Sequence, residues 1–247
     1  MTHLEQVWNT PPINLRLLKM EVHVWRASLE QPASVIQNLQ KFLAPDEVTR
    51  AWQFYFEKDR NHFIVARGLL RVILGRYLNT DPSHLRFCYN SYGKPSLDFI
   101  FHQVELSFNL SHSHNLALYA FAYSRQIGID VEYMHSNVDY EQLAKHSFSP
   151  YENAVFHALP LAIKRQAFFN CWTRKEAYIK ARGKGLSLSL DQFDVSLKPN
   201  EPARLLNSRE DPQEIVRWSL QALAPGTDYV GALAVEGSEW HLSCWQW

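Results

Sequence analysis

The stretch IGIDVEYM (residues 127–134) decides the fold of this chain, because it places two carboxylates inside an otherwise apolar run. A β-strand directs successive side chains to opposite faces of a sheet. The apolar side chains would then face one side, and Asp130 and Glu132 would lie together on the other. Like charges on one face repel, so the pair indicates either a solvated sheet edge or a site for a hard divalent cation.

Short strands and two long helical stretches surround this run. Before it, alternating hydrophobicity and helical periodicity predict a strand, a helical stretch and three further strands, at residues 21–29, 45–79, 85–90, 104–112 and 116–123. After it, residues 139–182 are predicted to be helical, with breaks near Pro150 and Pro160. Four more strands are then expected at residues 193–197, 215–223, 229–235 and 240–247.

The elements before and after the link near residue 125 repeat in the same order. Residues 65–73 correspond to 172–180, and Val24 corresponds to Val131, at an offset of about 107 residues. We therefore predict an α+β fold, a pseudo-dimer of two similar α+β subdomains, each with a small antiparallel sheet packed on helices. The predicted subdomains are residues 1–124 and 125–247, with the ligand site at their interface.

The composition excludes several classes of protein. Twenty-five basic residues balance 25 acidic ones among 247, so the chain lacks the broad positive field of a non-specific nucleic-acid binder. The three cysteines are scattered and indicate neither a disulfide framework nor a zinc site. The start of the chain lacks a signal-peptide layout, and no apolar run has the length of a membrane span. We expect a cytoplasmic monomer without nucleic-acid or membrane partners.

The helical stretch FFNCWTRKEAYIKARGKGLS (168–187) adds charged groups at helical spacing. Trp172, Glu176 and Lys180 are spaced i, i+4 and i+8 and lie on one helix face. Glu176 would supply a third carboxylate, and Lys180 would neutralise a phosphate oxygen. The alternative is an ordinary surface Glu–Lys pair, but the flanking aromatic residues favour a largely buried segment, where a glutamate needs a partner.

Polar and basic groups in the first half supply candidate phosphate contacts. The turn in FNLSHSHN (108–115) offers the hydroxyl of Ser111 and the imidazole of His112, although such turns also occur as plain loops. Lys94 lies in the turn YGKP, and Arg67 lies on the first long helical stretch. Each basic group alone is typical of a solvated surface, but together with a metal they would bind a ligand with several phosphates.

Five motifs taken in order resemble the signatures of the 4′-phosphopantetheinyl transferases: YGKP (92–95), FNLSHS (108–113), IGIDVE (127–132), WTRKEAYIK (172–180) and GKGLSLSLDQF (183–193). Length and the two-halved layout resemble the Sfp type of that superfamily, which activates polyketide, nonribosomal peptide and fatty-acid synthases. The resemblance implies a holo-[acyl-carrier-protein] synthase activity. Such an enzyme transfers the 4′-phosphopantetheine group of coenzyme A to a serine of an apo acyl or peptidyl carrier protein and releases adenosine 3′,5′-bisphosphate.

The resemblance also implies a role for each candidate residue. Asp130, Glu132 and Glu176 would bind Mg²⁺, Glu176 would act as general base, and Lys180 would assist the leaving group. Coenzyme A would be bound by Arg67, Lys94, Ser111, His112 and Lys180. Carrier proteins are acidic, so residues 134–150 and the outer side of 160–175 are the expected docking surface, with Lys145, Lys164 and Arg165 at its rim.

Two other functions remain open from the sequence. A Mg²⁺-dependent nuclease also uses clustered carboxylates with a lysine, although the neutral net charge and the lack of a basic tract count against it. A non-catalytic protein of the same fold that binds coenzyme A or a carrier is the second alternative. Asp130, Glu132 and the Glu176–Lys180 pair together favour a working enzyme, because a protein that only binds does not need all four groups.

Overall fold

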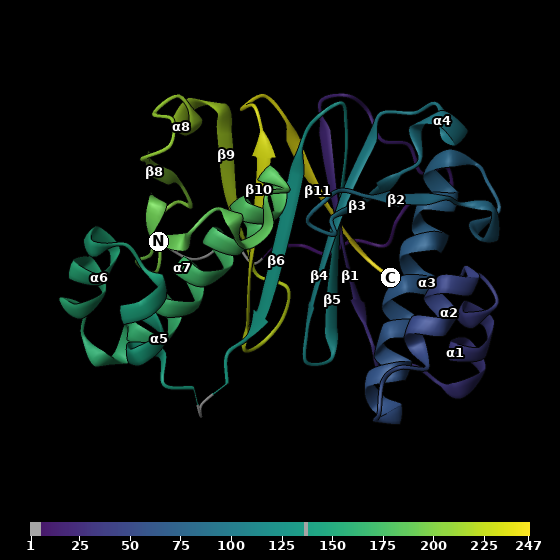
Figure 1. Ribbon diagram of the computed structural model, residues 1–247, viewed down its shortest axis with the longest axis horizontal. Helices are drawn as coiled ribbons and strands as arrows, with labels where there is room; N and C mark the ends of the chain where they lie inside the picture. The colour runs from purple at the N-terminus through teal and green to yellow at the C-terminus, as the bar shows by residue number, and fades with distance from the viewer. Residues whose placement is uncertain (1–5, 136–137) are drawn as a thin grey trace.

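Two β-sheets packed face to face form the centre of the molecule, and one long helix covers the outer face of each (Figure 1). This computed structural model describes residues 6–135 and 138–247. Helix α3 (Glu57–Leu78) packs on the first sheet and helix α7 (Leu161–Arg182) on the second. A third hydrophobic core lies between the sheets and takes residues from both. The layers are therefore helix, sheet, sheet and helix.

The first half of the chain runs from β1 to β5. Besides α3, its elements are β1 (Glu21–Ser28), α1 (Ala33–Gln40), α2 (Pro45–Ala51), β2 (Phe87–Tyr89), β3 (Pro95–Leu97), α4 (Phe99–His102), β4 (Leu106–Ser113) and β5 (Leu116–Tyr123). A short 3₁₀ turn at Pro82–His84 follows α3, which ends where Asn79 adopts the left-handed conformation with φ 49°.

The second half begins with β6. Besides α7, its elements are β6 (Ile127–Tyr133), α5 (Tyr140–Ser147), α6 (Pro150–His157), β7 (Phe193–Val195), β8 (Leu205–Ser208), α8 (Glu214–Arg217), β9 (Trp218–Leu223), β10 (Tyr229–Glu236) and β11 (His241–Gln246). Two 3₁₀ turns, at Gly185–Ser187 and Leu190–Gln192, lie between α7 and β7. Ser149 and Glu152 form a capping box at the start of α6, which explains the helix restart at Pro150.

The sheet order confirms the predicted α+β pseudo-dimer. The first sheet has the order β11-β1-β5-β4 and the second β6-β10-β9, so β1-β5-β4 is equivalent to β6-β10-β9. The hairpins β2–β3 and β7–β8 are likewise equivalent. The division at residues 124/125 stays a prediction. One strand crosses it, because β11 of the second half pairs in parallel with β1, with Cys244 opposite Val24.

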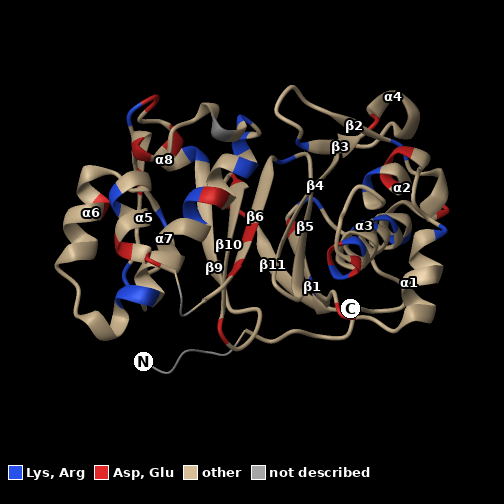
Figure 2. Cartoon of the chain, turned by 60° about the horizontal axis from the view of Figure 1, so that its bottom comes forward, with Lys and Arg blue, Asp and Glu red and all other residues tan. Residues whose placement is uncertain are grey.

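Strand β6 has the predicted alternation. Ile127, Ile129 and Val131 are fully buried in the core between the sheets. Asp130 and Glu132 lie on the other face, where Asp130 pairs with Lys180 of α7 and Glu132 is close to the charges of Lys180 and Glu176. In Figure 2, acidic positions on β6 lie beside acidic and basic positions on the neighbouring helix. The strand therefore separates an apolar face from a face that carries charge.

Two predicted elements differ from the structure. Residues 45–79 form two helices rather than one, because α2 turns back at residues 52–56 so that Glu47 can reach the arginines of α3. Residues 215–223 begin as the short helix α8, whose start is stabilised by the Asp211 carboxylate accepting from the Gln213 amide, and only then continue as β9. No helix in the described residues is long and apolar enough to cross a membrane.

Helix α7 lies unusually close to β6 at Gly128. A Cβ atom at this position would collide with the carbonyl oxygen of Ala177 and the amide nitrogen of Ala181. Those two alanines directly follow Glu176 and Lys180 in the helix. The missing side chain at Gly128 therefore allows the approach that brings Glu176 and Lys180 beside the acidic face of β6.

Candidate active site

The two halves meet where β4, an outer strand of the first sheet, runs alongside β6 of the second. Alternate residues Asn109, Ser111 and Ser113 extend from β4 toward β6. The Asn109 side-chain oxygen accepts from the Ile129 amide at 2.8 Å, and the Ser113 hydroxyl accepts from the Tyr133 amide at 3.1 Å. Side chains of β4 thus replace the backbone ladder that would otherwise join two neighbouring strands.

Asp130 is the centre of the polar contacts at this seam. Its side chain is buried, and its Oδ1 accepts from the Ser111 hydroxyl at 2.8 Å and from the Lys180 ammonium at 2.7 Å. Lys180 also donates to the Ser111 hydroxyl at 2.9 Å. One residue each from β4, β6 and α7 therefore forms a closed triangle, and it joins the first half of the chain to the second.

Glu132 and Glu176 add two half-buried carboxyl groups. The Glu132 carboxylate accepts from the Ser113 hydroxyl at 2.7 Å, yet burial and the charge of Asp130 raise the pKa of Glu132 to about 7. Burial, and then the charge of Asp130, also raise the pKa of Glu176. The charge of Asp130 thus disfavours the ionised forms of Glu132 and Glu176, and the charge of Lys180 acts in the opposite direction on both.

The donor set suits a hard divalent cation. The second carboxylate oxygen of Asp130, Oδ2, is buried without a hydrogen-bond partner, and such an acceptor is costly unless something positive meets it. Among the described residues, however, no three His, Cys, Asp or Glu side chains stand together as a finished ligand cluster. Mg²⁺ commonly uses one or two carboxylates and takes its other oxygens from water and substrate phosphates, so Asp130 and Glu132, with Glu176 nearby, fit that ion.

A cavity of about 650 Å³ opens beside the triangle. Its walls come from both halves, since Arg50, Arg67, Ser111 and His112 lie in the first half and Lys180 in the second. A cavity of this volume accommodates a ligand of cofactor size. A smaller cavity of about 270 Å³, lined in part by residues of the β2–β3 turn, places Glu176 beside the same Lys180.

Ser111 and His112 both line this cavity, and they lie within strand β4 rather than in the turn that the sequence predicted. His112 is exposed and lines the cavity wall. The surrounding protein, and secondarily the Lys180 charge, lower the pKa of His112. The ring is therefore neutral at pH 7 and offers one donor and one acceptor.

Arg67 lines the cavity but already has partners. Its guanidinium pairs with the Glu47 carboxylate, which also binds Arg71 at 2.6 Å, and it stacks on the Phe87 ring at 4.5 Å. A second hydrogen bond runs to the Tyr89 hydroxyl. The predicted contact between Arg67 and a phosphate stays a prediction, and it would use only the donors that these partners leave unused.

Lys94 has a different environment from the one expected of a ligand contact. Its ammonium donates to the carbonyl oxygens of Ile127 at 3.0 Å and Ala181 at 3.1 Å. Burial lowers the pKa of Lys94 to about 8. The group is thus occupied by the backbone of β6 and α7, and its predicted contact with coenzyme A stays untested.

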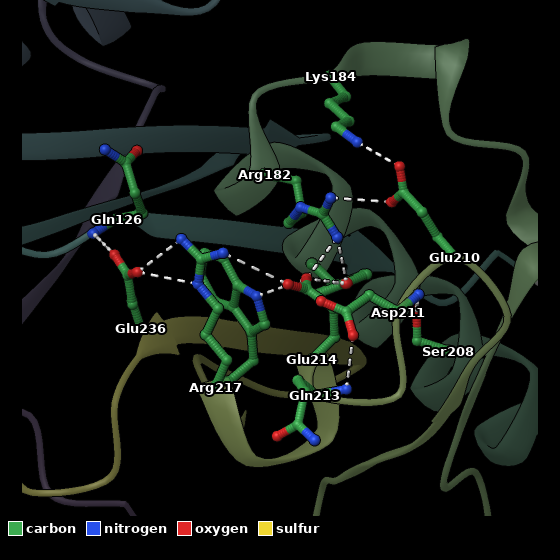
Figure 3. Close-up of polar contacts among 12 residues, drawn as sticks. Gln126, Arg182, Lys184, Ser208, Glu210, Asp211, Gln213, Glu214, Arg217 and Glu236 are labelled. Atoms are coloured by element: carbon green, nitrogen blue, oxygen red, sulfur yellow. Dashed lines mark hydrogen bonds and ion pairs between the residues drawn. The ribbon is translucent and has the colours of Figure 1, made fainter.

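The end of α7 is fixed by a second set of polar contacts (Figure 3). Arg182 binds Glu214 and Glu210, and Lys184 binds Glu210 as well. Glu214 is buried and also accepts from the Tyr178 hydroxyl at 2.6 Å. Tyr178 lies on the side of α7 that packs on the second core, so this set holds the helix to its own half.

Sequence reasoning missed three residues that shape the site. Asn109 and Ser113 join Ser111 in an N-x-S-x-S alternation on a strand, a signal that was present in the sequence. Lys175 is fully buried and pairs with Glu152 at 2.8 Å, while its neighbour Glu176, about 100° further round the helix, lines the smaller cavity. Nothing in the sequence identified Glu152 as its partner, because the two lie on different helices.

One predicted rim charge of the docking surface is wrong. Lys164 is buried and pairs with Glu141 at 2.8 Å, so it does not present a free charge to a partner. Lys145 is exposed, as expected. Residues 136 and 137 of that predicted surface lie outside the described residues.

Comparisons with known proteins match both halves of the chain. A family described as the 4′-phosphopantetheinyl transferase superfamily matches residues 126–234, and one described as 4′-phosphopantetheinyl transferase, N-terminal, matches residues 23–123. The 4′-phosphopantetheinyl transferase HetI of Nostoc sp. is 45% identical over 244 residues, which are 99% of this chain and 100% of that protein.

More distant relatives carry the same description. A putative 4′-phosphopantetheinyl transferase of Synechocystis sp. is 32% identical over 204 residues, 81% of this chain and 78% of that protein. The 4′-phosphopantetheinyl transferase Sfp of Bacillus subtilis is 32% identical over 171 residues, 68% of this chain and 74% of that protein. The similarity therefore extends across both halves and the seam between them.

Proposed function

Because the chain belongs to the 4′-phosphopantetheinyl transferase superfamily, we propose that it moves the 4′-phosphopantetheine group of coenzyme A to a serine of an apo carrier protein in a Mg²⁺-dependent reaction. The remaining product is adenosine 3′,5′-bisphosphate. The observation that carries the proposal is the triangle of Ser111, Asp130 and Lys180 beside a cavity that both halves line. Glu132 and Glu176 add two carboxyl groups beside Asp130, and Lys180 is the basic side chain next to them.

The reaction needs a proton acceptor and a group that neutralises charge. The serine oxygen of the carrier attacks the phosphorus that bears the pantetheine arm, a new P–O bond forms, and the bond to the adenosine bisphosphate oxygen breaks. Glu176 would take the serine proton, directly or through a water held at the site. The Lys180 ammonium would stabilise the negative charge on the departing phosphate.

The other candidate residues would bind and orient the substrate. Asp130 and Glu132, with Glu176, would hold Mg²⁺, and that ion would supply charge neutralisation at the diphosphate. His112 would donate to a phosphate oxygen from the cavity wall, and Ser111 would contact the ligand there while its hydroxyl proton stays on Asp130. The partnered guanidinium of Arg67 would bind a further phosphate. Arg50, which the sequence reasoning did not single out, lines the same cavity and is a second basic candidate.

Mass spectrometry of an apo carrier protein tests the proposal directly. The carrier is incubated with coenzyme A, Mg²⁺ and the enzyme, and its mass should rise by one phosphopantetheine group, about 340 Da from the group transferred. A panel with carriers from polyketide, nonribosomal peptide and fatty-acid synthases identifies the preferred partner. Chelation with EDTA should stop the transfer, and added Mg²⁺ should restore it.

Variants then separate catalysis from binding. Glu176→Gln keeps the size of the side chain but removes the base, and should lower kcat/KM by about 100-fold or more. Glu239→Gln is the matched control, because Glu239 is exposed and far from the triangle in sequence and contacts. No mass gain on any carrier would contradict the proposal, and Mg²⁺-dependent scission of plasmid DNA lost in Glu176→Gln would favour the nuclease alternative.

A further inference from the structure

The turn between β2 and β3 in the first half reaches across to the end of α7 in the second. The Asn90 side-chain amide donates to the carbonyl oxygen of Gly183 at 2.8 Å. The Lys94 ammonium donates to the carbonyl oxygens of Ala181 and Ile127. These three hydrogen bonds, called here the hairpin contact, join one turn of the first half to both α7 and β6.

Asn90 gives the turn the shape that makes this contact possible. Its side-chain oxygen accepts from the backbone amides of Tyr92 at 3.0 Å and Lys94 at 2.9 Å. Its own backbone amide donates to the Lys94 carbonyl at 3.1 Å. One side chain therefore orders the turn with its oxygen and bonds the opposite half with its nitrogen, although Asn90 itself is solvent-exposed.

The end of α7 is a place where such donors are needed. The last carbonyl groups of a helix have no partner within the helix, and they carry the negative end of its dipole. Gly183 closes α7 in the left-handed conformation, and its amide satisfies only the Ile179 carbonyl. The hairpin contact brings two donors from the first half to this helix end. The Lys94 ammonium bonds the Ala181 carbonyl, and the Asn90 amide bonds the Gly183 carbonyl.

This contact acts on the residues of the site through the helix that carries them. Lys180 precedes Ala181 directly, and Glu176 lies one turn earlier on the same face. Both must face Asp130 of β6, and Lys94 bonds β6 as well, at Ile127. Loss of the contact would let the last turn of α7 move relative to β6 and β4.

We propose that Asn90 and Lys94 are positioning residues, which fix the end of α7 against β6 so that Glu176 and Lys180 stay aligned with Asp130. The proposal rests on the transferase function proposed above. It assigns Lys94 a role through the protein backbone, in place of the contact with coenzyme A that its sequence motif implies.

Steady-state kinetics separate the two roles of Lys94. Lys94→Met removes the cation and should lower kcat by about 10-fold to 100-fold, because misplacement of catalytic groups acts on turnover. The KM for coenzyme A should stay within about twofold of the wild-type value, since binding groups in the cavity are intact. Lys94→Arg, which keeps a cation with several donors, should recover part of the lost kcat.

Asn90 provides an independent variant in the same contact. Asn90→Asp keeps the oxygen that orders the turn and replaces the donor to Gly183 with an acceptor. It should lower kcat without raising the KM for coenzyme A. The double variant Asn90→Asp/Lys94→Met should lose less than the product of the two single losses, because both act through one helix end.

Glu210→Gln is the matched control at the same helix end. It weakens the ion pairs of Arg182 and Lys184 but touches nothing in the first half among the contacts described here (Figure 3). Its kcat should stay within about twofold of wild type. A loss in Glu210→Gln as large as in Lys94→Met would mean that any loosening of the helix end is harmful, and would overturn the specific role of the hairpin contact.

Hydrogen exchange gives a readout that does not depend on activity. Amides of residues 180–184 should exchange faster in Lys94→Met and Asn90→Asp than in wild type, and at the wild-type rate in Glu210→Gln. If wild type transfers no phosphopantetheine, the proposed function fails while this measurement still tests the contact. A raised KM for coenzyme A with unchanged kcat in Lys94→Met would overturn the positioning role and restore the ligand contact.

Discussion

At the scale of single residues, the two carboxylate oxygens of Asp130 have different surroundings. One of its oxygens accepts from Ser111 and Lys180, and the other is buried without a partner. Folding stability alone does not favour an unpartnered buried acceptor, because desolvation of that oxygen is costly. The arrangement is therefore better explained by the need for a negative oxygen at this point when the substrate and its cation are bound.

The first prediction concerns this residue. Asp130→Asn keeps the shape and an acceptor for Ser111 but removes the charge, and should lower transfer activity by roughly 100-fold or more because an electrostatic group of the site is lost. The carrier mass assay measures the loss, and circular dichroism should show an unchanged fold. Activity within a few-fold of wild type would contradict the central role of Asp130.

The second prediction concerns acid stability and a histidine far from the substrate. His23 is buried beside Glu21 and shares a 2.8 Å hydrogen bond with Tyr77. Burial lowers its pKa to about 4, although Glu21 acts in the opposite direction. Between about pH 6.5 and pH 4, the unfolded chain binds a proton that the folded chain does not, so stability should fall as the pH falls through this window.

The lowered pKa of His23 corresponds to a loss of unfolding free energy on the order of 3 kcal/mol at the acid end of this window. Urea unfolding at pH 7 and at pH 5 should show a smaller acid loss in His23→Gln than in wild type, because glutamine does not titrate. Parallel losses in both proteins would assign the acid sensitivity to other groups.

At the scale of single residues, the sequence indicated which polar side chains lie at the site but not which side chains they pair with. Asp130, Glu132, Glu176, Lys180, Ser111 and His112 were expected together and lie at one seam. The ion pairs of Arg67 with Glu47 and of Lys164 with Glu141 were not foreseen. Periodicity assigns a residue to a face, but the residue that meets it there depends on how separate elements pack.

Elements were predicted best where periodicity was long and strong. The strands around residues 127–134 and 116–123 and the helix ending near residue 182 agree with the structure within a residue or two. The break at residues 52–56 was missed, because its cause is a tertiary ion pair rather than a local signal. The short helix α8 was missed because its first turn contains residues typical of strands.

The close approach of α7 and β6 leads to the third prediction. Gly128→Ala places a methyl group against the backbone of α7 at Ala177 and Ala181, and that backbone cannot move without shifting the helix. The variant should lose about 1–3 kcal/mol of unfolding free energy or more, together with most transfer activity. Urea denaturation measures the first effect and the carrier mass assay the second.

A second glycine provides the control for this substitution. Gly226→Ala meets only the Tyr229 ring, at 3.8 Å, so it should change stability by less than about 0.5 kcal/mol. Equal losses in both variants would indicate a general effect of glycine replacement, and not the contact between α7 and β6.

At the scale of the whole molecule, the two halves are joined by more than the link between them. The core between the sheets contains residues of both, and β11 leaves the second half to pair with β1 of the first. A further contact joins the halves near the start of the chain, where the backbone of Asn9 pairs with that of Trp245 in β11. The halves are therefore parts of one folding unit rather than independent domains.

The fourth prediction follows from this arrangement. A protease site inserted between Ser124 and Arg125 allows the link to be cut after folding. The cut protein should elute from a size-exclusion column at the volume of the intact chain, and separate only in denaturant, because apolar burial and the β1–β11 pairing persist. Two separate fragments in native buffer would contradict the prediction.

The internal repeat has a consequence for how tolerance to mutation is distributed. By the offset between the halves, the positions of Asp130, Glu132, Glu176 and Lys180 correspond in the first half to four buried residues: His23, Trp25, Leu69 and Ile73. The first half therefore has an imidazole ring, an indole ring and two aliphatic side chains where the second half has the proposed catalytic and metal-binding groups. Each chain should accordingly bind one equivalent of coenzyme A in isothermal titration calorimetry. Substitutions at the four first-half positions should lower the melting temperature before they lower kcat.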